Sequence, residues 1–351
     1  MATIKEVARL AGVSVGTVSN VITGMAPVAE PRKQRVQKVI RELNYHRNHV
    51  ARSLKLQRTK MLGMIVSDIT NPFFSQVVRG AEEAALKRGY LLLTFNTDDH
   101  VERERQVISV LQSRRVDGIL LVVAPSKTKP THIIETLKAG TPVVCLDRLP
   151  PGIAVDSVTV DNVGAARECV RHLIGRGHRK IGIITGSLAL ATAQQRLLGY
   201  EEAMREAGLD IDRRWMRRGD FRSESGYQLG REILQEEDRP TALFVCNNLM
   251  AYGVLRALDD LGLQCPRDLA IATFDDPTIT QVFRPRLTAV SQPAYSFGYT
   301  GTELLIQRIE SKTTGESPIA IRLPTELHIR ESSAPTLNRQ EERGETEASS
   351  S

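Results

Sequence analysis

Apolar and polar positions follow two different patterns along this chain, and the change comes near residue 60. Before it, apolar side chains recur at helical spacing in short segments. After it, short continuous apolar runs alternate with amphipathic stretches, as is typical of buried parallel strands covered by helices. The predicted strands are 62–67, 91–95, 118–123, 142–146, 180–185, 242–245, 270–274 and 287–290, and the predicted helices are 73–88, 101–114, 131–139, 163–175, 194–207, 224–235, 249–261 and 295–309.

The repeated strand–helix units imply an α/β body with parallel sheets covered on both faces. The eight predicted strands fall into two groups of four along the body of the chain. This grouping favours two doubly wound subdomains over one large sheet. Ligands of such folds bind outside the carboxyl ends of the strands, so two facing sheet edges would form a cleft. We expect a body at 61–331, with one subdomain at about 61–161 and 292–322 and the other at about 162–291 and 323–331.

Residues 1–46 carry the signals of a helix-turn-helix domain. The stretch Thr3-Ile4-Lys5-Glu6 fits a capping box, and Gly12 can adopt the positive φ at which a first helix ends. Ser14 can cap a second helix through its side-chain oxygen. Because two helices this short are unstable alone, a third helix at 32–43 must complete the core.

Positive charge is concentrated at this end of the chain. Residues 1–60 contain twelve Lys and Arg against three Glu, a net charge of +9, whereas the whole chain carries +6. The remaining 291 residues therefore carry −3. A compact basic helix-turn-helix joined to a near-neutral body is typical of a DNA-binding protein. The alternative is a solvated basic face on an ordinary helical bundle, which leaves the capped turn unexplained.

Composition narrows the class further. Apolar residues make up 41% and charged residues 25% of the chain, as in ordinary globular proteins. No run of about 18 apolar residues predicts a membrane span, and no secretory signal is present, so we expect a cytoplasmic protein without a membrane partner. The cysteines are widely spaced and form no CxxC pair, which favours reduced packing thiols over a metal site: Cys145, Cys169, Cys246 and Cys265.

Two rival functions are disfavoured. An enzyme is disfavoured because the sequence lacks a Walker-type phosphate loop, a dinucleotide glycine fingerprint, a nucleophile elbow and histidines at metal-ligand spacing. We therefore expect no catalytic residue, cofactor or metal. A solute-binding protein without a regulatory role would have a similar body, but the basic head and the missing secretory signal disfavour it.

The two segments outside the head and the body differ in character. The connector at 47–60 has helix-forming basic residues at 50–55, and a helix this short is marginal alone, so it would become ordered on docking. The alternative is a flexible tether. The tail at 332–351 is rich in Ser, Glu and Arg without an apolar period, and is expected to be disordered.

Short motifs in order along the chain resemble the LacI/GalR family of bacterial transcription regulators, over nearly the full length apart from the tail. They include Ala11-Gly12-Val13-Ser14, Val50-Ala51-Arg52-Ser53-Leu54, Asn71-Pro72-Phe73-Phe74, Leu146-Asp147-Arg148 and Phe274-Asp275-Asp276. The resemblance implies a nucleoid-associated repressor with a periplasmic-binding-protein-like body. It also implies a homodimer that binds a pseudo-palindromic double-stranded DNA operator and responds to a small-molecule effector, most readily a sugar or sugar derivative, in the cleft.

The resemblance places the second helix of the head in the major groove of the operator. Val15, Gly16 and Asn20 would then face base edges. Val15 can contact a thymine methyl, Gly16 permits close backbone approach, and Asn20 can pair with adenine. The alternative for Val15 is a packing role. Thr17 and Tyr45 are interpreted as phosphate contacts, which position the head without reading the base sequence.

In the same resemblance, Leu54 lies on a hinge helix and enters the minor groove as an apolar wedge, with Lys55 following it. The alternative for Leu54 is packing between the hinge helices of a dimer, and the two roles are compatible. Tetrameric family members carry C-terminal leucine heptads, whereas 332–351 contains only Leu337, so a dimer is expected.

Effector contacts are expected near strand ends in the body. Aromatic rings can stack on a sugar or a base, and a guanidinium with a carboxylate can grip vicinal hydroxyls or ring nitrogens. The alternatives are a core role for Phe73 and an interdomain salt bridge between Arg196 and Asp275. Asn248 stands where the family more often has Asp, so no specific sugar is assigned. The candidates are Phe73, Phe74, Arg148, Arg196, Phe221, Asn247 and Asp275.

Overall fold

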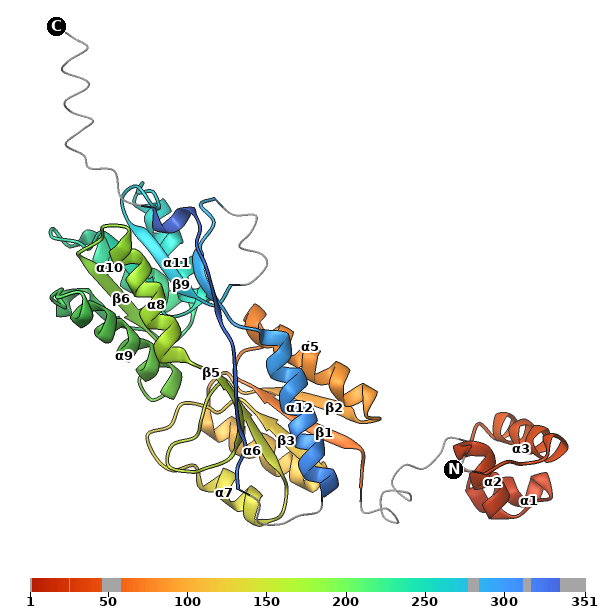
Figure 1. The fold of residues 1–351 in the computed structure, drawn as a ribbon. Coiled ribbons are helices and arrows are strands. Elements are labelled where there is room, and N and C mark those ends of the chain that lie inside the picture. Colours follow the sequence, from red (N-terminus) through yellow and green to blue (C-terminus); the bar gives the residue numbers. More distant parts are fainter. Residues whose placement is uncertain (1, 25, 46–57, 277–283, 312–316, 335–351) are drawn as a thin grey trace, which may run out of the picture. The chain divides into compact units, whose positions relative to one another are not determined.

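The chain forms two compact units, Met1–Thr59 and Lys60–Ser351, which we call the head and the body. The computed structural model describes residues 2–24, 26–45, 58–276, 284–311 and 317–334 (Figure 1).

The head is a three-helix domain made of α1 (Ile4–Ala11), α2 (Val15–Thr23) and α3 (Glu30–Glu42). Gly12 ends α1 at φ +61°. The Ser14 hydroxyl accepts a hydrogen bond from the Thr17 N–H at 3.1 Å and so caps α2. The three helices share one apolar core, formed by Val7, Ala8, Ala11, Val18, Val36 and Val39. The local signals therefore predicted this domain correctly.

The first lobe of the body is built on a six-stranded parallel sheet. Its strand order is β11 (Ala320–Leu323), β5 (Asp156–Val160), β4 (Val143–Leu146), β3 (Gly118–Leu121), β1 (Met61–Val66) and β2 (Leu91–Asn96). Near-continuous apolar runs form the central strands, as expected for strands buried on both faces. The helices of this lobe are α5 (Pro72–Lys87), α6 (Val101–Ser113), α7 (Thr131–Lys138) and α12 (Ala294–Ser311).

The second lobe contains the other six-stranded sheet, in which only the pairing of β12 with β10 is antiparallel. Its strand order is β12 (Glu326–His328), β10 (Thr288–Ser291), β9 (Ala270–Phe274), β8 (Ala242–Val245), β6 (Ile181–Thr185) and β7 (Met216–Arg218). Its α-helices are α8 (Asn162–Gly175), α9 (Ala191–Glu206), α10 (Ser223–Gln235) and α11 (Asn248–Asp260).

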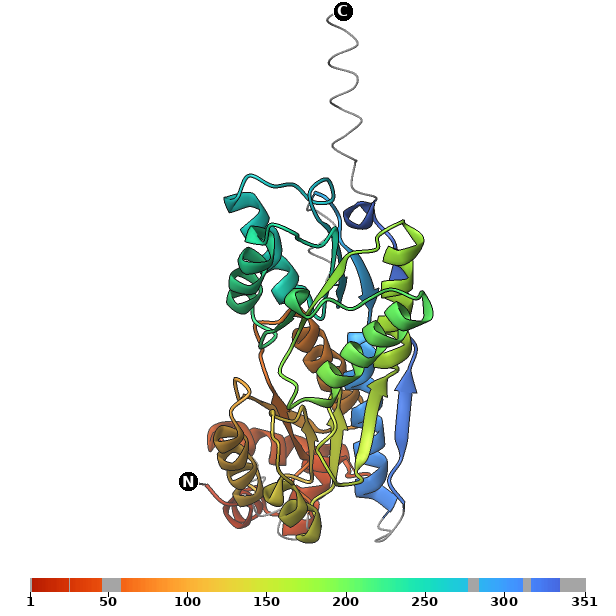
Figure 2. The same cartoon turned by 90° about the vertical axis from the view of Figure 1, so that its left-hand side faces the viewer.

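The chain passes between the two lobes three times. It leaves the first sheet after β5, returns from the second sheet after β10, and crosses again between β11 and β12. Figure 2 shows the two lobes of the body one above the other, with strands of both running toward the region between them. Within the described residues, no helix has both the length and the apolar composition that crossing a bilayer requires.

The prediction of four strands per sheet was wrong, because the sequence pattern missed β5, β7, β11 and β12. Three of them lie at sheet edges, where side chains stay partly in water and no continuous apolar run is needed. The strand β7 is Met-Arg-Arg, and β5 has alternating polar residues. Period-2 alternation over such short segments was too weak a signal.

The start of the tail was also predicted wrongly. Residues Glu331–Ser333 form a short 3-10 helix, and Ser332 and Ser333 are fully buried. The Ser332 hydroxyl accepts from the Thr288 N–H at 2.8 Å, and Ser333 Oγ lies 2.8 Å from His172 Nε2. These polar contacts hold the segment on the second lobe without any apolar period. The rest of the predicted disordered tail, 335–351, lies outside the described residues.

Candidate DNA-binding and effector-binding sites

The start of α2 presents an exposed surface. Val15 is 42% exposed and Gly16 is exposed, while Thr17 and Asn20 are half-buried. Val15 therefore has little packing role within the head, which leaves its methyl groups accessible to a partner. Tyr45 is half-buried against the core of the head. Leu54 and Lys55 lie outside the described residues, so their expected minor-groove role stays a prediction.

All the predicted effector residues line one cavity between the two lobes. Its wall is completed by four residues that were not predicted: Asn71, Asp147, Thr192 and Gln292. Its volume is about 30 Å³, which is close to the share of one water molecule in the liquid. The lobes thus lie close together here. A larger guest can enter only when the lobes part, and lining side chains must move before the lobes close over it. The predicted lining residues are Phe73, Phe74, Arg148, Arg196, Phe221, Asn247 and Asp275.

Both lobes supply an aromatic wall. Phe73 and Phe74 come from the first turn of α5, where the Asn71 side chain accepts from the Phe73 N–H at 3.0 Å. Their rings meet edge to face, with centroids 5.1 Å apart, and Phe73 also contacts Phe297 at 5.6 Å. Phe73 therefore belongs to the core of the first lobe as well as to the cavity wall. Phe221 belongs to the second lobe and also lines the cavity.

Arg196 is held rigidly by its own lobe. Its Nε donates to Asn162 Oδ1 at 2.9 Å and its Nη1 donates to the Cys246 carbonyl at 2.7 Å. The guanidinium carbon lies 3.7 Å from the ring centroid of Phe274, a cation–π contact. Arg196 and Asp275 both belong to the second lobe, so the alternative of an interdomain salt bridge between them was wrong.

Arg148 is buried and surrounded by acidic groups. Its Nη1 donates to Asp99 Oδ1 at 2.5 Å and lies 3.4 Å from the Val123 carbonyl. Its Nε lies 3.7 Å from Asp147 Oδ2, beyond hydrogen-bond distance. Among the described residues, Arg148 Nε and Asp147 Oδ1 are both buried without a hydrogen-bond partner. Such orphaned groups beside a cavity are available to a ligand.

Burial changes the acidity of two cavity carboxyls. Desolvation raises the pKa of Asp147 to about 6, and the guanidiniums of Arg196 and Arg148 oppose that rise. Burial likewise raises the pKa of Asp275, against the opposing effects of Arg196 and of the hydrogen bond that Gln292 donates at 2.5 Å. Perturbed carboxyls in a cleft are typical of functional sites.

Strained backbone gathers around the same cleft. Just beyond strand ends, Asp98, Asp99, Asp147, Phe221 and Asp275 adopt φ between +52° and +69°. Non-glycine residues rarely take this left-handed conformation, and it persists at functional sites where surrounding contacts impose it. Neighbouring contacts do so here, since the Asn247 amide donates to the Phe221 carbonyl at 2.8 Å.

The sequence held two kinds of signal for the missed lining residues. Asn71 and Asp147 belong to motifs that carry the family resemblance, and polar residues at strand ends are a weaker signal. Asp147 adjoins Arg148 just after β4, and Gln292 directly follows β10. Many other polar residues follow strands in this chain, however, and only the folded arrangement shows which ends face each other.

Known protein families match parts of both the head and the body. The model described as "Bacterial regulatory proteins, lacI family" matches residues 3–48, and the one described as "Periplasmic binding protein-like domain" matches residues 170–333. The HTH-type transcriptional repressor PurR of Haemophilus influenzae (strain PittEE) is 38% identical over 333 residues, which cover 95% of this chain and 98% of that protein.

Two solved structures are also similar. The lac repressor dimer bound to operator and the anti-inducer ONPF has a TM-score of 0.83 and 26% identity, covering 95% of this chain and 99% of that one. A putative ribose operon repressor from Burkholderia thailandensis has a TM-score of 0.69 and 33% identity, covering 77% of this chain and 99% of that one.

The basic helix-turn-helix head and the two-lobed α/β body define a class, the DNA-binding transcription regulators with a sensor body. This class does not consist of enzymes, which confirms the expectation from the missing catalytic motifs. Within it, the chain belongs to the LacI family of bacterial transcription regulators. Repressors of this family bind operator DNA and small-molecule effectors.

Proposed function

We propose that this chain is a transcriptional repressor whose effector is a small neutral sugar, bound between the two lobes of the body, with D-ribose as the first candidate. The head of each subunit in a homodimer would read one half of a pseudo-palindromic operator through Val15, Gly16 and Asn20, with Thr17 and Tyr45 on phosphates and Leu54 and Lys55 in the minor groove. Such a protein acts in the compartment of the chromosome, the bacterial cytoplasm.

The observation that carries the sugar assignment is the density of paired donors and acceptors around one small cavity. A sugar hydroxyl both donates and accepts, so vicinal hydroxyls satisfy carboxylates and guanidiniums together. The aromatic rings of both lobes supply apolar faces for the C–H side of a sugar ring. The polar lining residues are Asn71, Asp147, Arg148, Thr192, Arg196, Asn247, Asp275 and Gln292.

Charge favours an uncharged effector. Among the described residues that line the cavity, Arg148 and Arg196 are the basic groups. Arg148 lies beside the carboxyls of Asp99 and Asp147, and Arg196 attracts those of Asp147 and Asp275 electrostatically. The guanidiniums are thus already balanced by acidic groups, and a sugar phosphate or a sugar acid would meet repulsion in a buried place. The similarity to a putative ribose operon repressor supports a pentose in particular.

A nucleobase is the second candidate. The aromatic walls from both lobes suit a planar ring, and Arg196 with Asp275 can pair with ring nitrogens as well as with hydroxyls. A base offers fewer donors and acceptors than a pentose, however, and would leave more of the polar lining unpaired.

Thermal-shift and calorimetric titration of the full-length chain with D-ribose, other pentoses, hexoses and nucleobases tests the proposal. A true effector at about 100 times its dissociation constant should stabilise the body by about 2.7 kcal/mol. Arg196→Ala and Asn247→Ala should abolish that shift, whereas Arg171→Ala, which removes an ion pair on the surface of the second lobe, should preserve it. Binding of nucleobases alone would refute the sugar assignment.

Operator binding forms the second half of the test. Fluorescence anisotropy with a pool of labelled duplexes should select a sequence with two-fold symmetry. A matched chain with Asn20→Ala should lose selectivity while keeping salt-dependent binding, because phosphate contacts supply that part of the affinity. Adding the effector should then change the affinity for the selected duplex, and the direction of the change identifies it as inducer or corepressor.

A further inference from the structure

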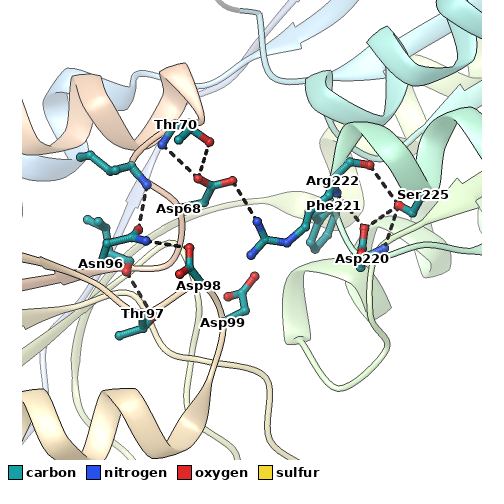
Figure 3. A network of polar contacts seen from close by, with 12 residues as sticks. Asp68, Thr70, Asn96, Thr97, Asp98, Asp99, Asp220, Phe221, Arg222 and Ser225 are labelled. Atoms are coloured by element: carbon teal, nitrogen blue, oxygen red, sulfur yellow. Dashed lines mark hydrogen bonds and ion pairs between the residues drawn. The ribbon is translucent and has the colours of Figure 1, made fainter.

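One ion pair joins the two lobes at the mouth of the cleft. Arg222 follows Phe221 in the second lobe, and its Nη1 lies 3.7 Å from Asp68 Oδ2, just after β1 in the first lobe (Figure 3). The side chain of Asp68 is 13% exposed and that of Arg222 is 40% exposed. The pair therefore lies at the edge of the cleft, outside the cavity lining.

The Asp68 carboxylate and the backbone that carries Arg222 are each held within their own lobe. Asp68 Oδ1 accepts from the Thr70 N–H at 3.0 Å and from the Thr70 hydroxyl at 2.5 Å, which leaves Oδ2 for Arg222. On the other lobe, the Arg222 N–H donates to Asp220 Oδ1 at 2.9 Å, and the Ser225 hydroxyl donates to the Arg222 carbonyl at 3.0 Å. Side-chain ordering limits most exposed ion pairs, and the Thr70 contacts remove the part of that cost that Asp68 would contribute.

The rim of the first lobe around Asp68 is acidic. Asp98 and Asp99 follow β2, close to the guanidinium of Arg222 in Figure 3. Asp98 has a pKa below its ordinary value because the Asn96 amide donates to it, Arg103 pairs with it, and Arg222 adds a further attraction. The second lobe thus places a cation against several carboxylates of the first lobe.

The turn that contains Arg222 also contains Phe221, which lines the cavity. Phe221 is 9% exposed and lines the cavity, whereas the next residue reaches across the mouth. The Phe221 ring lies so close to Gly186 that a Cβ added there would be 2.2 Å from it. Because neighbouring contacts fix this turn, a movement that brings Phe221 toward a guest also brings Arg222 toward Asp68.

We propose that Arg222 and Asp68 form a clasp that stabilises the closed arrangement of the lobes and so sets the apparent affinity for the effector. An effector held between closed lobes benefits from every contact that stabilises closure, so the apparent dissociation constant rises when such a contact is lost. The clasp depends on the proposed effector site in the cleft but not on the chemical identity of the effector. Arg222 acts here as a positioning residue, without touching the guest.

The first measurement needs no ligand. Spin labels at Glu102→Cys on α6 and Gln235→Cys on α10, in a Cys265→Ser background, report the distance between the lobes in the full-length chain. Arg222→Gln and Asp68→Asn should each broaden the distribution toward longer distances. The Asn side chain in Asp68→Asn still accepts from Thr70, so the turn survives. Arg171→Gln, which breaks the exposed Arg171–Glu206 pair within the second lobe, should leave the distribution unchanged.

The second measurement is a double-mutant cycle on the apparent affinity for D-ribose. Each single substitution should weaken binding about 2- to 5-fold, as expected for a partly exposed ion pair. The double variant should be no weaker than either single variant, because the two groups act together. Unchanged distances in Arg222→Gln, or fully additive losses in the double variant, would overturn the clasp. If the Arg222 and Asp68 variants open the lobes but the unmodified chain binds no sugar, the clasp is supported and the sugar assignment is refuted.

Discussion

Asp147→Asn should make the effector-free protein more stable while weakening effector binding. Burial raises the pKa of Asp147 from the ordinary 3.8 to about 6, so its ionised form is disfavoured in the folded state. This rise in pKa lowers the free energy of unfolding by about 3 kcal/mol at pH values above 6. Asn resembles the neutral acid, so it avoids this cost. The expected increase in melting temperature is on the order of 5 °C.

The raised pKa of Asp147 also determines how the free energy of unfolding changes with pH. Between roughly pH 4 and pH 6, the folded protein binds more protons at Asp147 than the unfolded chain does. This carboxyl therefore makes the free energy of unfolding fall as pH rises through that window. The stability advantage of Asp147→Asn should be largest above pH 6 and should shrink toward zero as pH falls toward 4.

Urea unfolding of both proteins from pH 4 to pH 8 measures this difference. Asp259→Asn, which changes an exposed carboxyl on α11, should show no such pH-dependent advantage. A stability difference that stays constant with pH would refute the reasoning, since a repacking effect would not follow protonation. Titration with D-ribose should show a loss of affinity in Asp147→Asn, because the orphaned Asp147 Oδ1 can no longer act as an ionised acceptor.

Three further substitutions have definite expected outcomes. Gly186→Ala should displace the Phe221 ring, because the added Cβ would lie 2.2 Å from it, and calorimetry should show weaker effector binding with little change in operator binding. In Asp99→Asn, Arg148 loses the carboxylate that it contacts at 2.5 Å and keeps only a neutral amide partner. Effector affinity should fall several-fold, and unchanged affinity would exclude a positioning role for Asp99. Ser14→Ala removes the cap of α2 and should destabilise the head by about 0.5–2 kcal/mol. The measurable effects are a lower melting temperature of the head and weaker operator binding. Ser14→Asp, which can cap the helix in the same way, should restore the melting temperature and the operator binding.

Much of the fold follows from local chemistry in the sequence. The head was predicted from its capping residues, and the central strands of both sheets from apolar runs that burial on two faces requires. Edge strands such as β7 and β11 escaped prediction, since a partly solvated strand needs few apolar side chains. Ser332 and Ser333 escaped because buried hydroxyls, and no apolar period, hold their segment.

The candidate effector site was only partly predictable. Aromatic and charged residues in the family motifs proved to line one cavity, and so did Asn71 of the same motifs. Thr192 lies in none of these motifs, and Gln292 had only its polarity after β10 as a signal. Their place depends on which loops from two lobes face each other, and that is set by the long-range course of the chain. The left-handed backbone of Asp147 and Asp275 was not predicted either, because Asp adopts this conformation more often than most residues but still at few positions.

The weaving of the chain between the lobes has a consequence for how this molecule is made. The edge strand β11 pairs with β5, more than 150 positions earlier, and β12 then completes the opposite sheet. Neither lobe is thus a contiguous stretch, and neither sheet can close until nearly the entire polypeptide has left the ribosome. The helix-turn-helix, by contrast, is complete within the first few dozen residues. A nascent repressor would acquire its reading domain long before its sensor, and a prematurely terminated product would retain the former without the latter.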